Sequence, residues 1–217
     1  MAVALVLVGA LAGCRSAPGT ARGSALLAPS AAALERPAPD SFVVAFTTSR
    51  GPFEVLVRRH WAPRGADRLH FLVNAGYYDG LRFFRVVSGF MAQFGIHGDT
   101  AINAAWRTRR IADDSVRTGN ARGTVTFATA GPNSRTTQLF INFADNRRLD
   151  PMGFAPLGTV ITGMSVGDSL HAGYGEGAPR GGGPDQGRMQ REGSAYLAFG
   201  FPKLDTIVTA RVSRRWP

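Results

Sequence analysis

The alternation of apolar and polar residues predicts β-strands along most of the chain after residue 40. Residues 41–48 and 52–57 are rich in valine and phenylalanine, and the short Ser-Arg-Gly-Pro turn between them predicts an opening hairpin. Six further runs, bounded by glycine-rich turns, have the length and composition of strands: residues 81–87, 90–95, 123–128, 138–143, 157–162 and 204–212.

Two short helices interrupt this strand pattern. Pro63 stands where a helix can begin, apolar side chains recur after it at helical spacing, and Gly76 provides a C-terminal stop. A second helix is expected near Ser165. The sequence therefore predicts an all-β domain, a closed eight-stranded antiparallel β-barrel whose ends are covered by two α-helices.

Residues 1–13 form an apolar run that is too short to span a bilayer but has the length of a signal-peptide core. The tetrad from Leu11 to Cys14 resembles a bacterial lipobox, which implies that residues 1–14 are a lipoprotein signal and that the thiol of Cys14 receives a diacylglycerol. The alternative is that Cys14 is a buried core residue in an ordinary N-terminal strand. The alanine and glycine residues around it would pack poorly there, so lipidation is favoured.

Residues 15–40 are rich in alanine, proline and serine and have the composition of a linker, so the folded domain is expected to cover residues 41–217. The lipoprotein resemblance implies a protein of the bacterial cell envelope that is attached to a membrane by its lipid and faces the periplasm. Arg15 is not the aspartate associated with retention in the inner membrane, which favours the outer membrane.

The composition is that of an ordinary globular protein, with 44% apolar and 18% charged residues. The net charge of +10 comes almost entirely from arginine, because Lys203 is the only lysine. Codon bias in a GC-rich genome explains this excess without a function, although a basic surface would still attract anionic partners. The arginines form no stripe or aromatic-interleaved motif, so nucleic-acid binding is not predicted.

Metal and nucleotide sites are not indicated either. The single cysteine excludes an internal disulfide and a cysteine-cluster metal site. The histidines show no i, i+4 pairing and no carboxylate at ligand spacing: His60, His70, His97 and His171. The glycine-rich residues 173–183 lack the strand, helix and Gly-Lys-Ser/Thr ending of a phosphate-binding loop and are predicted to form a long surface loop.

Two motifs carry a family resemblance. Residues 83–95 read FFRVVSGFMAQFG, which closely resembles the cyclophilin signature F-x-R-V-x-x-G-F-x-x-Q-x-G. Residues 123–142 contain the segment A-G-P-N followed by T-Q-L-F-I, which is similar to a second block of that family, and Leu149-Asp150 and Gly158 match later positions. The motifs occur in family order and span essentially the whole domain.

The resemblance implies a peptidyl-prolyl cis-trans isomerase that acts on proline-containing polypeptides and assists the folding of envelope or secreted proteins. It implies no cofactor. We expect the protein to be a monomer. Arg85 is the expected catalytic residue, and Gln93 is expected to position it and the substrate carbonyl. The remaining expected contacts form the proline pocket and peptide groove: Phe90, Met91, Ala128, Thr129, Gln138, Phe140, Leu149 and Phe154. The alternative is a catalytically idle cyclophilin-like domain that serves as a peptide-binding or scaffold module.

The residue types suit the chemistry. Rotation about a peptide bond has a barrier of about 18–20 kcal/mol because its C–N bond has partial double-bond character. No bond breaks, so the reaction needs a donor that favours localisation of the lone pair on the prolyl nitrogen and a pocket that holds the ring. Arginine is always charged and presents several N–H donors in a rigid arrangement.

Two positions depart from the eukaryotic pattern and resemble bacterial members. Arg148 stands where tryptophan is common, and Phe154 stands near the usual histidine position. We therefore expect Phe154 to close the proline pocket. We also expect weak binding of cyclosporin, because the missing tryptophan is the family's usual contact for that ligand.

Overall fold

The computed structural model describes residues 25–217, so the predicted signal peptide and Cys14 lie outside the described part of the chain. Its first two strands, β1 (Ser41–Thr48) and β2 (Gly51–Arg58), form the predicted hairpin. Gly51 follows the turn with a φ of 118°, a conformation that favours glycine. The expected strands and the two expected helices are all present, and the hairpin leads into the following elements: α3 (Pro63–Asn74), β3 (Arg85–Val87), β4 (Met91–Phe94), α4 (Thr100–Arg107), β5 (Thr124–Phe127), β6 (Leu139–Asn142), the 3₁₀ helix η1 (Arg147–Met152), β7 (Pro156–Thr162), α5 (Met164–Asp168), α6 (Gln186–Gly200) and β8 (Ile207–Trp216).

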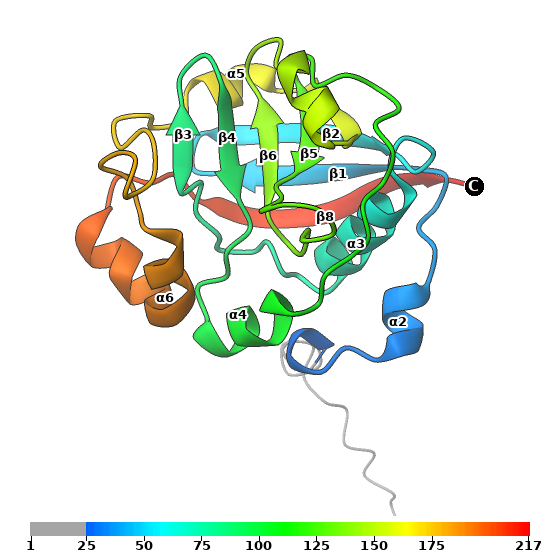
Figure 1. The fold of residues 1–217 in the computed structure, drawn as a ribbon, viewed down its shortest axis with the longest axis horizontal. Coiled ribbons are helices and arrows are strands. Elements are labelled where there is room, and N and C mark those ends of the chain that lie inside the picture. The colour runs from blue at the N-terminus through cyan, green and yellow to red at the C-terminus, as the bar shows by residue number, and fades with distance from the viewer. Residues whose placement is uncertain (1–24) are drawn as a thin grey trace, which may run out of the picture.

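The strands form one antiparallel sheet of eight strands in the order β3-β4-β6-β5-β7-β2-β1-β8. Figure 1 shows that β3, β4, β6 and β5 run across the direction of β2, β1 and β8, so the sheet curls around an interior. The apolar residues of alternate positions fill that interior, including Phe42, Val44, Phe94, Phe127 and Leu139.

The two edge strands of the sheet are β3 and β8, and the segments that immediately precede them in the chain approach each other. The contact there is an isolated antiparallel bridge between Arg82 and Thr206, supported by hydrogen bonds from Phe83 N to Asp205 O (3.0 Å) and from Ile207 N to Leu81 O (2.7 Å). No continuous ladder joins β3 to β8 among residues 25–217. The structure is therefore a curled sheet, and the predicted closed barrel is not confirmed.

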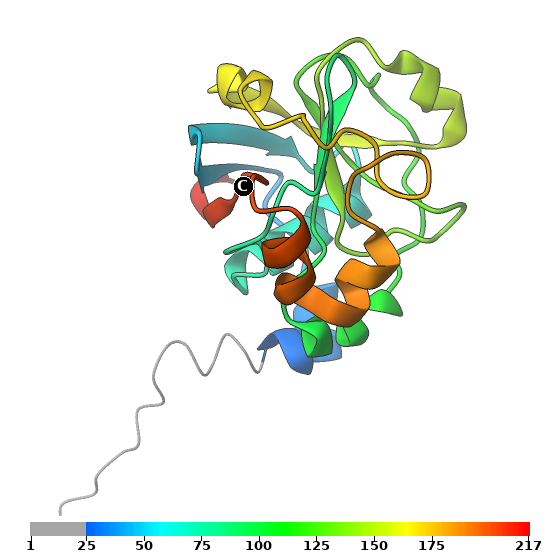
Figure 2. The same ribbon diagram turned by 90° about the vertical axis from the view of Figure 1, so that its left-hand side faces the viewer.

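The predicted number of two helices is wrong. The expected helices are α3, which begins at Pro63, and α5, but the described chain also contains α4, α6, η1 and a short helix α2 (Ala31–Glu35). The apolar pattern of α6 is broken by Gly193, whose φ of 62° and ψ of −145° interrupt the helix. In α4 only eight residues are helical, too few for a clear periodicity. Figures 1 and 2 show these two helices side by side below the sheet.

The chain packs onto the domain before Ser41, the boundary that its composition predicts. Leu26 is only 4% exposed and belongs to the main core, and the indole Nε1 of Trp106 donates a hydrogen bond to Leu26 O (2.8 Å). The backbone N–H of Ala38 donates to Asp67 Oδ1 (2.8 Å). Residues 26–38 are thus held against α3 and α4. None of the helices within residues 25–217 has the length and apolar character needed to span a membrane.

Candidate active site

The register of three neighbouring strands brings the predicted catalytic residues together. Arg85 on β3 pairs with Gln93 on β4, and Gln93 pairs with Phe140 on β6, so the three residues lie in one row across the sheet. Because strand side chains alternate between faces, Ala92 and Phe94 point from β4 into the main core while Gln93 lies on the other face. The motif spacing in the sequence therefore encodes one functional face.

A cavity of about 310 Å³ lies over this row. All ten residues that the sequence predicts for catalysis and substrate binding line it: Arg85, Phe90, Met91, Gln93, Ala128, Thr129, Gln138, Phe140, Leu149 and Phe154.

One half of the cavity is apolar. Met91, Phe140 and Leu149 are at most 8% exposed and form a small cluster separate from the main core, with Phe90 and Phe154 packed against it. The rings of Phe140 and Phe154 meet edge to face with their centroids 5.8 Å apart. This half can take up an apolar ring the size of proline.

Buried polar contacts fix the walls of the apolar half. Asn120 is fully buried, and its amide donates hydrogen bonds to Asp150 Oδ1 (2.7 Å) and to Phe154 O (2.8 Å). These bonds hold η1, which carries Leu149, and the loop that carries Phe154. The asparagine has no motif of its own that would have marked it in the sequence.

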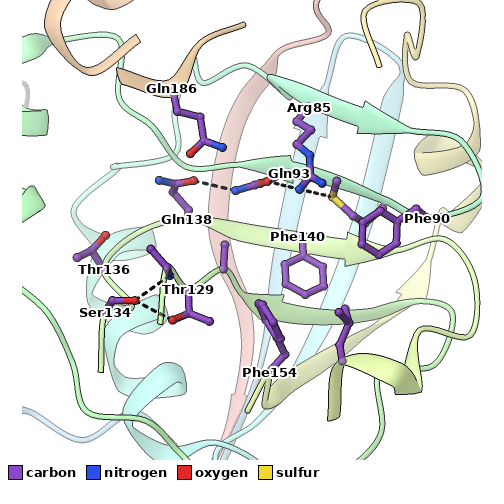
Figure 3. A pocket seen from close by; sticks show the side chains of 14 residues that line it. Arg85, Phe90, Gln93, Thr129, Ser134, Thr136, Gln138, Phe140, Phe154 and Gln186 are labelled. Atoms are coloured by element: carbon purple, nitrogen blue, oxygen red, sulfur yellow. Dashed lines mark hydrogen bonds between the residues drawn. The ribbon is translucent and has the colours of Figure 1, made fainter. Parts of the chain in front are cut away.

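The second half of the cavity is polar. Gln138 Oε1 accepts a hydrogen bond from Gln93 Nε2 (2.8 Å), and Gln93 Oε1 accepts one from Arg85 Nη1 (3.0 Å). Figure 3 shows the two amides and the guanidinium in a line above the ring of Phe140. This series of hydrogen bonds orients the guanidinium of Arg85 at the border between the two halves of the cavity.

The comparisons with known proteins agree with this site. Residues 43–185 match the family model described as cyclophilin type peptidyl-prolyl cis-trans isomerase/CLD. The chain belongs to the cyclophilin family. Its curated relatives include peptidyl-prolyl cis-trans isomerase A of Dickeya dadantii, 37% identical over 134 residues that cover 58% of this chain and 70% of the relative. A peptidyl-prolyl cis-trans isomerase of Acinetobacter baylyi is 34% identical over 133 residues, which cover 59% of this chain and 71% of that protein. These matches support an enzyme with peptidyl-prolyl isomerase activity.

Solved structures support the fold. A crystal structure of a cyclophilin-type isomerase from Cryptosporidium parvum superimposes with a TM-score of 0.60 over 81% of this chain and 99% of that protein. Its sequence identity of 18% is low, so this likeness concerns the fold alone.

Four further residues line the cyclophilin cavity and were not predicted: Ala130, Ser134, Thr136 and Gln186. The hydroxyls of Thr129 and Ser134 lie 2.7 Å apart, and Ser134 Oγ also accepts a hydrogen bond from Ala130 N (2.8 Å). Ala130, Ser134 and Thr136 belong to the block of residues 123–142 that carried the family resemblance, so their proximity could have been inferred. Gln186 begins α6 and reaches the cavity only because that helix docks beside the sheet (Figure 3).

Glu176 was also missed, although it makes two short contacts with the guanidinium of Arg85. Its Oε1 accepts a hydrogen bond from Arg85 Nε (2.6 Å) and its Oε2 accepts one from Arg85 Nη2 (2.7 Å). The hydrogen bond with Arg85 lowers the pKa of the Glu176 carboxyl below its ordinary value, so this carboxyl is ionised at neutral pH. No local signal in the sequence marks this residue, since it lies 91 positions from its partner.

Proposed function

We propose that this cyclophilin accelerates rotation about X-Pro bonds by holding the proline ring in the apolar half of the cavity while Arg85 donates a hydrogen bond to the prolyl nitrogen. That bond favours localisation of the nitrogen lone pair, which reduces the double-bond character that opposes rotation. Preorganised donors in a partly dry site are effective because they need no reorientation during the reaction.

One observation carries the proposal: the guanidinium of Arg85 and the ring of Phe140 face the same cavity from one row of residues. The single N–H of Nε and one N–H of Nη2 donate to Glu176, and one N–H of Nη1 donates to Gln93. The other N–H on Nη1 has only the weak acceptor Met91 Sδ, 3.9 Å from the nitrogen. A substrate can take that donor without breaking a strong hydrogen bond.

The groove beside the proline pocket suits an extended peptide. Ala128 and Thr129 follow β5, and Gln138 precedes β6, so backbone and amide groups lie along one wall. We assign Gln93 the positioning of Arg85 and of the substrate carbonyl, and the groove residues the binding of the flanking peptide. A relative from Cryptosporidium parvum has been crystallised in the presence of the dipeptide Ala-Pro, which supports a proline-containing substrate.

We further propose that the enzyme works as a monomer in the bacterial envelope, on secreted or outer-membrane polypeptides, and that a lipid on Cys14 tethers it to the periplasmic face of a membrane, preferably the outer one. The lipobox resemblance is the basis for the tether. Residues 26–38 pack beside α3 and α4, and no residue of this segment lines the cavity. This arrangement is compatible with a tether that leaves the cavity accessible.

A proline-limited refolding assay tests the function. The purified chain should accelerate the slow, isomerisation-limited phase of a model substrate and should raise the cis-to-trans rate of a Xaa-Pro peptide. Binding of the peptide without any acceleration would instead support the idle peptide-binding module.

A further inference from the structure

We propose that Glu176 is a positioning residue of this isomerase: it holds the guanidinium of Arg85 in the orientation that leaves a donor facing the proline pocket. The inference rests on the proposed role of Arg85.

The geometry of the ion pair is that of an orienting contact. The two carboxylate oxygens of Glu176 meet Nε and Nη2 of Arg85 at 2.6 and 2.7 Å, so they occupy one edge of the planar guanidinium. Gln93 binds Nη1 on the opposite side. Two contacts to one edge fix both the position and the plane of the group, which a single hydrogen bond would leave free to rotate.

The carboxylate itself is held by its own loop. Gly177 N donates a hydrogen bond to Glu176 Oε1 (3.0 Å), and Gly183 N donates one to Glu176 O (2.9 Å). A parallel bridge joins Gly177 and Gly183, and the N–H of Gly181 donates to Gly177 O (3.2 Å). Residues 176–183 therefore close on themselves into a compact loop.

Glycine is required at particular points of this loop. A Cβ added to Gly181 would lie 2.4 Å from Glu176 O and 2.9 Å from Glu176 Cβ, closer than atoms can pack. A Cβ added to Gly182 would meet no atom within 4 Å. The glycine-rich sequence thus lets the backbone fold tightly behind Glu176.

The chain that follows the loop is anchored beside the site. After it, Asp185 caps α6, and its backbone N–H donates to the hydroxyl of Tyr196 (3.1 Å). A separate apolar cluster includes Met189 of α6 together with Phe84 and Ile96, which lie next to the strands that carry the catalytic row. The loop and α6 are therefore fixed relative to Arg85.

Steady-state kinetics of single and double variants tests the inference. Glu176→Gln keeps the size of the side chain but replaces one of the two acceptor oxygens with an amide NH₂ group. That group is a donor and cannot accept a hydrogen bond from the guanidinium. We expect kcat to fall about tenfold with little change in KM, because misplacing a catalytic group lowers the rate by up to about 100-fold while the ring pocket is untouched. In an Arg85→Ala background the same change should have no further effect, because coupled residues are not additive.

Two glycine variants provide a matched pair. Gly181→Ala should lower kcat in the same direction as Glu176→Gln, and Gly182→Ala should leave kcat and KM at the values of the unmodified chain. An Arg85→Ala protein with full activity would contradict the proposed function itself.

An inactive Arg85→Ala protein, together with a Glu176→Gln protein whose rate is unchanged or higher, would overturn only the positioning role of Glu176. Equal losses from Glu176→Gln in both backgrounds would also overturn it, since they would reflect a general disturbance.

Discussion

The side chains of β4 point alternately to the main core and to the cavity, so one short strand contributes to both the core and the catalytic site. Ala92 and Phe94 belong to the main core, while Met91 and Gln93 line the cavity. Phe140 on β6 follows the same rule, with Leu139 and Ile141 in the core on either side. A shift of register by one residue would exchange the two faces and remove the site.

Phe140→Ala should weaken substrate binding and turnover together, because the ring is 5% exposed and belongs to the apolar cluster that lines the cavity. Truncation of a buried phenylalanine costs about 3–5 kcal/mol of unfolding free energy. Chemical denaturation and peptide kinetics measure both effects. Phe199→Ala is the control, because that ring is 95% exposed. Normal kinetics and stability for Phe140→Ala would show that this ring does not form the pocket.

The predictability of site residues depended on where their neighbours lie in the chain. The ten predicted lining residues stand within or next to family motifs, where fixed spacing on paired strands sets their positions. Glu176 and Gln186 could not be found in this way. Glu176 contacts Arg85 from a loop, and Gln186 lines the cavity from the start of α6. The positions of that loop and that helix depend on contacts with residues about 90 positions away in the chain.

At the scale of elements, strands were predicted more reliably than helices. The eight strands stand out because apolar runs and glycine turns are local features. A local signal for α4 did exist: Asp99 precedes it and its side chain accepts hydrogen bonds from Ala101 N (2.7 Å) and Ile102 N (3.3 Å). For α6 the interruption at Gly193 hides the periodicity, and the helix is held by the small core beside the sheet.

A histidine just before α4 should make stability depend on pH. Burial lowers the pKa of His97 below its ordinary value of 6.5, and the neutral ring accepts a hydrogen bond from Asp99 N at Nδ1 (2.9 Å). The unfolded chain therefore binds a proton more readily than the folded one. The contribution of neutral His97 to the free energy of unfolding is fully present above the pKa of the unfolded chain. It decreases as pH falls from about 6.5 toward the folded pKa, by at most about 1.4 kcal/mol per pH unit for one proton.

Urea unfolding at a series of pH values measures this dependence. The pKa of His70 is also lowered by burial, so we expect His97→Asn to reduce the slope and not to abolish it. His60→Asn, at an exposed position, serves as the control. Identical slopes for the unmodified chain and His97→Asn would exclude a contribution from His97.

At the scale of the whole molecule, arginine supplies the cation of every ion pair found in residues 25–217. Most of these pairs lie at or near the surface and contribute little stability individually. Arg135 is the exception, because it is buried and bonds to the buried carboxylate of Asp114 (3.0 Å). The positive charge is thus largely a surface property, as expected from its scattered distribution in the sequence.

The proposed membrane tether concerns the whole molecule as well. We expect Cys14→Ser to release the protein from the membrane fraction, because one modified residue would supply the main apolar attachment. Metabolic labelling with a clickable fatty acid, followed by fractionation, measures this. Label and membrane association that are equal in the unmodified chain and in Cys14→Ser would contradict lipidation of this residue.

The kcat/KM of Arg85 variants on a Xaa-Pro peptide tests the central claim most directly. Arg85→Ala should lose most of the activity while remaining folded, because the side chain lines a cavity and does not belong to the main core. Arg85→Lys keeps the charge but loses the planar set of donors, so it should remain at least about tenfold below the unmodified chain, roughly 1.4 kcal/mol in the barrier. A folded Arg85→Ala protein with full activity would contradict the account.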